Sequence, residues 1–320
     1  MKLSYKVSNK TKYQTIKEVL KIEFSMSDRL LLKLKKLQKI LLNHEVVYVH
    51  HPIKTGDLIE CDLDYEEDNS NIVSTQMPLS ILYEDEAYLV INKPAGIPVH
   101  PSCDHYTDSL SNGVRYYFNQ IGLHKKIRPV NRLDKDTSGL VIFAKNEYVQ
   151  ECLVKQMKSK EFIKKYIAIV EGHLKEKEGT ICAPIARKEN SIIERCVNEN
   201  GETSITHYRI LNSKELNKLF KIDKDKEIDN IPKYNNCIHV TNSQFYIVEC
   251  TLETGRTHQI RVHFAYIGHP LLGDTLYGNP SPLITRQALH SYSVSFVHPI
   301  LKERVNYIAP IPDDFKKLIK

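Results

Sequence analysis

The chain has 320 residues, of which 41% are hydrophobic and 26% charged, a balance typical of a soluble globular protein of roughly two domains. No apolar run approaches the roughly 18 residues that a membrane-spanning helix needs, so we expect a cytoplasmic protein without a membrane partner. The seven cysteines are scattered and form no Cys-x-x-Cys pair, which argues against a disulfide framework and a zinc ribbon.

Positive charge is concentrated near the N-terminus. Residues 1–60 hold twelve Lys and Arg residues against six Asp and Glu residues, which accounts for the whole net charge of +6. An excess of positive charge at one end of the chain indicates an anionic partner such as nucleic acid.

A basic helix is predicted after Ser27, because Ser27 can cap it and Asp28 places negative charge in its first turn. Leucines recur at helical spacing along it, at Leu30, Leu34, Leu37 and Leu41. Basic residues follow another side, at Arg29, Lys33 and Lys36. We expect that side to bind RNA phosphates, and a merely solvated helix face is the alternative.

A turn at Asn43-His44, a strand at 46–49 and a turn into a strand at 58–61 follow the predicted helix. This order resembles the small alpha-L RNA-binding module first seen in a ribosomal protein, in which Asn-Gly is the usual turn. We therefore expect an alpha-L RNA-binding domain at residues 1–63, a polar linker at 64–77 and a catalytic domain at 78–320.

Several strands are predicted in the second domain from apolar or alternating runs, at 87–91, 140–144, 163–170, 203–208, 244–252 and 288–298. Asn146 can cap a helix that follows the second of these strands. On the strand at 163–170, Tyr166 shares a face with Ala168 and Val170, so it either packs in the core or points into a site. The polar span 212–242 is predicted to be an exposed insertion.

The stretch 128–140 combines two arginines, two aspartates, two hydroxyl side chains and a glycine immediately before the apolar run 140–144. A polar loop at the edge of a buried strand is held by a rigid scaffold that can aim a side chain. A solvated turn is the alternative interpretation.

Two other chemistries resemble part of this loop. The spacing of Asp134, Asp136 and Ser138 imitates the start of a calcium loop, but its twelfth position is Lys145 rather than glutamate. The run 134–137 also imitates the aspartyl-phosphate motif of a phosphotransferase, although that motif normally follows a buried strand and this one precedes it. The phosphotransferase stays as a rival interpretation.

Cofactors and metals find no support in the sequence. A Walker loop and a Gly-x-Gly-x-x-Gly turn are both absent. His258 and His263 are five apart, which separates them by ~140° on a helix and places them on opposite faces of a strand. We therefore expect neither a small-molecule cofactor nor a metal site.

A second polar stretch, 253–270, predicts a short helix that Thr257 caps and Gly268 ends. On this helix His258 and Arg261 are three residues apart and share a face.

Three segments together resemble the RluA-type pseudouridine synthases. They are Arg132-Leu133-Asp134 with Thr137-Ser138-Gly139, the strand segment 165–172, and Thr254 to His263. Asn92 to Gly96 and Leu289-His290 are also similar to that family, so the resemblance covers roughly residues 80 to 310. It implies an α+β pseudouridine synthase fold with a mixed, largely antiparallel central sheet, and an isomerase that converts specific uridines in structured RNA.

The resemblance also implies roles for individual residues. Asp134 stands at the position of the catalytic aspartate, the family's nucleophile, and Arg261 at that of the arginine that pairs with it. Tyr166 matches the tyrosine that stacks on the target base, and Arg132 matches the residue that fills the gap left by the flipped base. Asn131 stands where the family usually has histidine, and we expect a structural role for it.

Large-subunit ribosomal RNA is the expected substrate because of the N-terminal module, with transfer RNA second. We expect a monomer. The alternative from another functional class is a non-catalytic RNA-binding or ribosome assembly factor built on a retained synthase fold.

Overall fold

The computed structural model describes residues 1–220, 237–240 and 243–319. Most of the predicted insertion at 212–242 lies outside these residues. Its first part is the helix α5 (Ser213–Phe220), which buries Leu216 and Phe220. The prediction of an exposed insertion is therefore wrong for this portion, because two apolar side chains one helical turn apart pack into the core.

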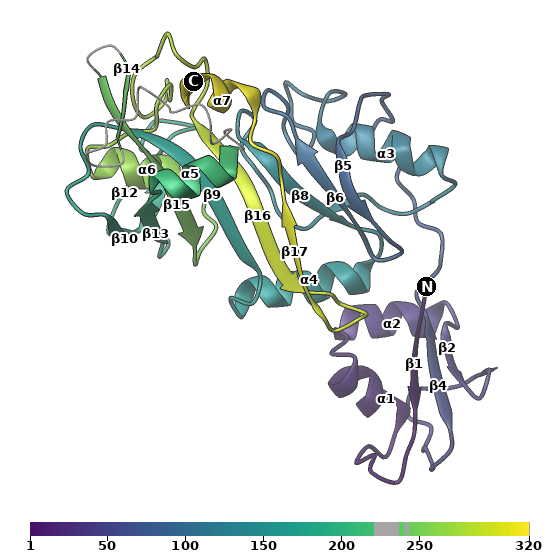
Figure 1. Ribbon diagram of the computed structural model, residues 1–320. Helices are drawn as coiled ribbons and strands as arrows, with labels where there is room; N and C mark the ends of the chain where they lie inside the picture. The colour runs from purple at the N-terminus through teal and green to yellow at the C-terminus, as the bar shows by residue number, and fades with distance from the viewer. Residues whose placement is uncertain (221–236, 241–242, 320) are drawn as a thin grey trace.

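The N-terminal lobe contains a four-stranded antiparallel sheet in the order β1-β4-β2-β3. In Figure 1 it forms a separate small unit below the large sheet. Its elements are β1 (Lys2–Lys6), α1 (Ile16–Glu18), a π-helical turn (Val19–Glu23), α2 (Asp28–Lys36), β2 (Ile40–Leu42), β3 (Glu45–Val46) and β4 (Leu58–Asp62).

The helix predicted after Ser27 is confirmed as α2, and the Ser27 hydroxyl oxygen accepts a hydrogen bond from the backbone N–H of Leu30 at 3.1 Å. The helix ends earlier than the leucine spacing predicts. Gln38 adopts a φ of 55°, a left-handed conformation that ends helices. The chain then turns, so Leu41 lies in β2 rather than on the helix.

The connecting segment 64–77 contains neither helix nor strand, yet it is bound along its length to the second lobe. The Glu67 carboxylate accepts two hydrogen bonds from the Arg128 guanidinium, at 2.6 and 2.7 Å. The side-chain Oδ1 of Asn69 accepts from the backbone N–H of Ile127 at 3.1 Å, and Ile72 is buried.

The second lobe is built on a sheet of eleven strands within the described residues, in the order β10-β13-β15-β9-β16-β8-β6-β5 with three further strands at its sides. Among the described strands only β8 and β16 pair in parallel, which confirms the mixed, largely antiparallel sheet of an α+β fold. The strands are β5 (Ile81–Glu84), β6 (Tyr88–Lys93), β7 (Arg128–Pro129), β8 (Ser138–Ala144), β9 (Ile163–Glu171), β10 (Glu178–Cys182), β13 (Ile205–Ile210), β14 (Cys237–Val240), β15 (Ser243–Leu252), β16 (Leu289–Val297) and β17 (Arg304–Ile308).

The remaining elements lie around this sheet (Figure 1). They are the helices α3 (Leu110–Gln120), α4 (Glu147–Lys158), α6 (Gln259–Tyr266) and α7 (Asp313–Ile319), and a separate hairpin of two short strands, β11 (Ile185–Arg187) and β12 (Arg195–Val197).

No helix of the described chain has both the length and the apolar character needed to cross a membrane.

Strand β9 lies at the centre of the sheet and is buried on both faces. Tyr166, Ala168 and Val170 join one hydrophobic cluster, whereas Ile167 and Ile169 join another on the opposite face. This alternation follows from the period of two in a strand and confirms the predicted face of Tyr166.

Candidate active site

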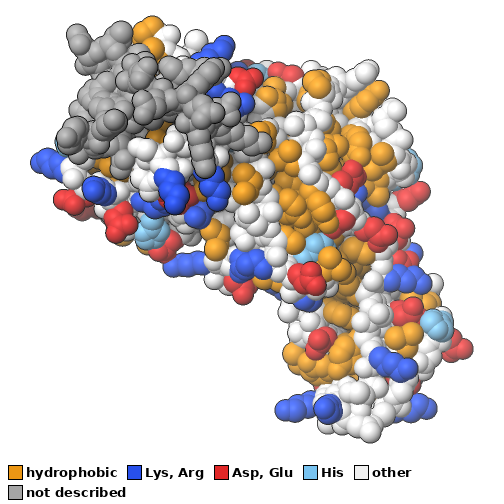
Figure 2. Space-filling model, viewed as in Figure 1, with side chains coloured by type: hydrophobic (Ala, Val, Ile, Leu, Met, Phe, Trp, Pro, Cys, Tyr) orange, Lys and Arg blue, Asp and Glu red, His pale blue; other side chains and the backbone are white. Residues whose placement is uncertain are grey.

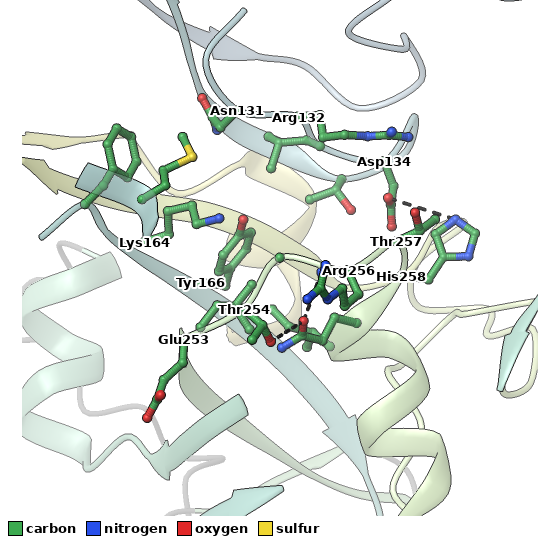
Figure 3. A pocket seen from close by; sticks show the side chains of 18 of the residues that line it. Asn131, Arg132, Asp134, Lys164, Tyr166, Glu253, Thr254, Arg256, Thr257 and His258 are labelled. Atoms are coloured by element: carbon green, nitrogen blue, oxygen red, sulfur yellow. Dashed lines mark hydrogen bonds and ion pairs between the residues drawn. The ribbon is translucent and has the colours of Figure 1, made fainter. Parts of the chain in front are cut away.

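A cavity of about 610 Å³ opens where the loop before β8, the strand β9, the end of β15 and the start of α6 meet. Figure 3 shows the arrangement of its side chains. Asp134 and His258 lie on one side of the cavity, and Tyr166 and Lys164 lie on the other. Three segments that are far apart in the sequence, 129–137, 157–166 and 251–260, therefore share one site.

The loop that carries Asp134 is a tight turn into β8. The backbone N–H of Thr137 donates to the carbonyl oxygen of Asp134 at 3.1 Å. Gly139 has a φ of 114°, and a Cβ at this position would lie 2.1 Å from the Ser291 carbonyl oxygen. Only glycine allows β8 and β16 to approach so closely, and this approach sets the position of the loop.

The Asp134 carboxylate faces a fixed guanidinium. Its Oδ2 is 3.5 Å from Nη1 of Arg261. Arg261 is held in turn by the wholly buried Asp274, with Nε to Oδ2 at 2.7 Å and Nη2 to Oδ1 at 2.8 Å. This bidentate pair fixes the plane of the guanidinium and leaves Nη1 for Asp134.

Asp274 is a site residue that the sequence did not reveal. It lies thirteen positions after Arg261, in the turn beyond α6, and no periodic pattern connects the two.

Tyr166 and Arg132 differ in exposure. Tyr166 is 5% exposed, and burial raises the pKa of its phenol, so the ring enters the cavity wall as a neutral group. Arg132 is exposed and also lines the cavity. The site therefore combines a buried aromatic side chain with an exposed cation.

Lys93 supports the loop that carries Asp134. Its wholly buried ammonium donates to the carbonyl oxygens of Pro94, Ile97 and Lys135, each at 2.8 Å. Because Lys135 follows Asp134, these bonds tie the turn at 92–97 to the loop. Burial lowers the pKa of Lys93 to about 7. The sequence predicted the turn but not this contact.

Comparison with known proteins agrees with this geometry. Residues 87–266 match the family model described as RNA pseudouridylate synthase. The chain is 38% identical to the Bacillus subtilis RNA pseudouridine synthase YhcT, over 98% of this chain and 95% of that protein. The chain belongs to the RNA pseudouridylate synthase family. It is therefore an isomerase that acts on RNA, as the resemblance predicted.

Two further relatives support the assignment. A Xanthomonas campestris protein named ribosomal large subunit pseudouridine synthase D is 32% identical over 87% of this synthase and 80% of that protein. The solved structure of human RNA pseudouridylate synthase domain containing 1 is 26% identical, covers 73% of this chain and 84% of that one, and has a TM-score of 0.55.

Asn131 joins the start of the loop that carries Asp134 to β8. Its Nδ2 donates to the carbonyl oxygen of Leu140, and its Oδ1 accepts from the backbone N–H of Ile142, both at 2.9 Å. An amide presents a donor and an acceptor on adjoining atoms, so it continues the ladder of the sheet. The contacts are structural, as expected for this position.

The start of α6 differs from the prediction. His258, not Thr257, is the N-cap, and it has a left-handed φ of 60° without a side-chain capping bond. Its Nε2 lies 4.0 Å from Oδ1 of Asp134. The expected helix stop is confirmed, because Gly268 has a φ of 81° just after the last turn.

The three basic residues predicted on the N-terminal helix lie outside the cavity. The Lys33 ammonium is 2.8 Å from a Glu67 oxygen and 3.0 Å from a Glu147 oxygen. Burial alone would lower the pKa of Lys33, but these two hydrogen bonds outweigh it and raise the pKa. Arg29 is exposed with its Nε 3.3 Å from Glu147, and Lys36 is exposed.

Among the described residues, no group of three or more His, Cys, Asp and Glu side chains is arranged to hold a metal ion.

Proposed function

We propose that this synthase isomerises uridines of large-subunit ribosomal RNA with Asp134 as its nucleophile. The observation that carries the proposal is the carboxylate of Asp134 in the cavity wall, 3.5 Å from a guanidinium that a second carboxylate fixes. Buried Tyr166 lies across the same cavity.

The reaction rearranges bonds within one nucleotide. An Asp134 oxygen attacks C1′ of the ribose, and the bond from C1′ to N1 of uracil breaks. The base turns within the cavity, C5 bonds to C1′ and the carboxylate leaves. The C5 hydrogen departs as a proton and N1 gains one, so the reaction needs no redox partner.

The base must leave its helical stack before Asp134 can reach the sugar. Tyr166 offers a flat, neutral face on which uracil can stack. Arg132, exposed at the mouth, is long enough to enter the gap that the base leaves. Arg261 keeps the carboxylate aimed because its own position is set by Asp274.

The N-terminal lobe would hold the RNA outside the cavity as an alpha-L module. Arg29 and Lys36 are exposed on α2 and can bind phosphates. Lys33 contributes less, because two carboxylates already share its ammonium. Figure 2 shows Lys and Arg side chains spread over the visible face of this lobe, which suits contact with the backbone of a folded RNA.

The choice of ribosomal RNA is supported by the names of relatives such as the Xanthomonas campestris enzyme. Transfer RNA is the second candidate. Pseudouridine mapping of total RNA from a strain that lacks the gene tests the choice. Loss of a pseudouridine from large-subunit RNA supports it, and loss from transfer RNA alone overturns it.

Tritium release from RNA labelled at C5 of uridine tests the nucleophile. We expect release by the wild-type protein and none above background by Asp134→Asn, with both proteins binding the RNA. Normal release by the variant would overturn the proposed mechanism. Absence of release by the wild type on every RNA tested would favour the non-catalytic assembly factor.

A further inference from the structure

Tyr277 lies beyond α6 and connects three parts of the site. Its hydroxyl is 2.8 Å from the backbone nitrogen of Arg195 and 2.8 Å from Nδ1 of His258. The Arg261 guanidinium lies over its ring, 5.0 Å from the centroid. One side chain thus touches the hairpin strand β12, the arginine of the site and the histidine beside Asp134.

The direction of one of these hydrogen bonds is fixed by its donor. The backbone N–H of Arg195 can only donate, so the Tyr277 oxygen accepts from it. The hydroxyl hydrogen is then available for Nδ1 of His258, which lies 2.8 Å from the same oxygen. A histidine that accepts at Nδ1 is neutral and carries its hydrogen on Nε2.

The surroundings of His258 favour the neutral form. Burial lowers its pKa, and the nearby Arg261 and Arg195 lower it further, whereas Asp134 and Asp274 act in the opposite direction. The net result is a lowered pKa. His258 also stands at the start of α6, where the helix dipole disfavours a cation.

The backbone of His258 holds the ring in an uncommon position. Its φ of 60° is left-handed, a conformation that few residues other than glycine adopt and that often occurs at functional sites. With Nδ1 turned to Tyr277, the opposite nitrogen faces Asp134, with Nε2 at 4.0 Å from Oδ1 (Figure 3).

We infer that His258 is a positioning residue for the isomerisation: Tyr277 holds it as the neutral Nε2–H tautomer, and this N–H is directed at Oδ1 of Asp134. The inference rests on the proposed role of Asp134. The two carboxylate oxygens then face different donors, Oδ1 the imidazole and Oδ2 the guanidinium of Arg261. The neutral donor orients the carboxylate without binding it as tightly as a second cation would, so the nucleophile stays free to attack.

Two substitutions of His258 test the roles of its two ring nitrogens separately. In His258→Asn the amide oxygen can replace Nδ1 as acceptor for Tyr277, and asparagine tolerates the left-handed backbone, but no donor reaches Asp134. We expect kcat for tritium release to fall about tenfold, with KM within about twofold, because the Asp134 carboxylate loses the neutral donor that orients it. The pH–rate profile should also change, because the variant lacks the imidazole, whose pKa is lowered beside Asp134 in the wild type. His258→Gln places an N–H near the position of Nε2 and should recover part of kcat.

Tyr277→Phe removes the hydroxyl and keeps the ring over Arg261. Nδ1 then loses the donor that selects the tautomer. We expect a loss of kcat that is largest at alkaline pH and shrinks as the pH falls, because an imidazolium carries hydrogen on both nitrogens. Tyr266→Phe, a change at the exposed last residue of α6, is the control and should match the wild type.

Thermal unfolding and RNA binding are measured for every variant. A wild-type kcat and pH profile in His258→Asn would overturn the inference, as would a loss of kcat in Tyr277→Phe that is equal at all pH values. Asp134→Asn separates this failure from that of the proposed function. If Asp134→Asn is inactive while His258→Asn is normal, only the proposed role of His258 is wrong. If Asp134→Asn is active, the proposed function is wrong.

Discussion

Glu67 at the junction of the two lobes and Asp134 in the cavity each face two basic side chains, but at different distances. Glu67 accepts from Arg128 at 2.6 and 2.7 Å and from Lys33 at 2.8 Å, and its side chain is 3% exposed. Asp134 is 21% exposed, and its nearest basic groups lie at 3.5 and 4.0 Å.

The difference separates a structural carboxylate from the carboxylate that we propose as the nucleophile. The oxygens of Glu67 are filled by short charge-assisted hydrogen bonds, which stabilise the contact between the lobes. The oxygens of Asp134 lie beside donors that orient them and remain free to form a new bond. Asp274 belongs with Glu67, because its short bidentate pair with Arg261 is structural.

The largest contrast is expected for loss of the charge on each carboxylate. Asp134→Asn should lower tritium release at least about a thousandfold, as removal of a nucleophile does, and leave the melting temperature within a few degrees of the wild type. Single-turnover assays and calorimetry on the same preparation measure both effects. A large fall in melting temperature would mean that Asp134 is structural as well.

Asp274→Asn tests the connection between the two kinds of carboxylate. The amide removes the charge that fixes Arg261, so Nη1 no longer holds its position beside Asp134. We expect kcat to fall by on the order of thirtyfold, equivalent to about 2 kcal/mol, together with a lower melting temperature. A variant with full activity would show that Asp134 does not depend on a fixed guanidinium.

Glu67→Gln should have the opposite profile. It leaves Arg128 buried with one partner fewer, and we expect the protein to lose about 3 kcal/mol of stability, with kcat on a short RNA stem unchanged. Urea unfolding measures the loss. Glu66→Gln, at the exposed neighbouring position, is the matched control and should leave stability unchanged. Equal effects of the two substitutions would contradict the structural role of Glu67.

Acid should weaken the same contact. Burial raises the pKa of Glu67, but the hydrogen bonds from Arg128 and Lys33 outweigh it and lower the pKa from its ordinary 4.5 to about 2. The stabilisation is therefore complete above pH 4.5 and is lost as the pH falls through about 2. Between these pH values, the free energy of unfolding in urea should decrease as the pH falls in the wild type, and Glu67→Gln should reduce this dependence. The same pH dependence in both proteins would contradict the role assigned to Glu67.

The smallest effects concern Lys33 and Lys36 on the same helix. Lys36→Ala should lower RNA affinity and reduce the slope of log K against log salt by roughly 0.7 to 0.9, as loss of one phosphate contact does. Lys33→Ala should mainly lower stability, because its ammonium bonds to Glu67 and Glu147. Filter binding at several salt concentrations compares them. An unchanged slope for Lys36→Ala would favour the alternative interpretation, in which this side of α2 is only a solvated helix face.

Several elements were predictable because their signals are local. Asn146 caps α4 through its side chain, and the apolar run before it forms β8, buried along its whole length. The alternation along β9 placed Tyr166 correctly. These features depend on residues within a few positions of one another, where caps and periodicity act.

Helix α3 shows where local signals fail. It begins with a capping box between Ser109 and Asn112, and it contains Gly113, a residue that disfavours helices. A Cβ at Gly113 would lie 2.4 Å from Cγ of Met77, so the glycine allows the segment before β5 to pack on the helix. Nothing near Leu110 predicts that contact. The elements within the first 26 residues, β1 and α1 among them, were missed as well.

The sequence by itself determined the family and the class of sheet. It also named Asp134, Tyr166 and Arg261 as candidates, because each belongs to a short motif whose residues are neighbours in the chain. Only the tertiary structure decided which groups hold them. Asp274 fixes Arg261, Lys93 ties down the loop of Asp134, and Tyr277 orients His258. These contacts join different segments and follow no period, so folding alone brings them together.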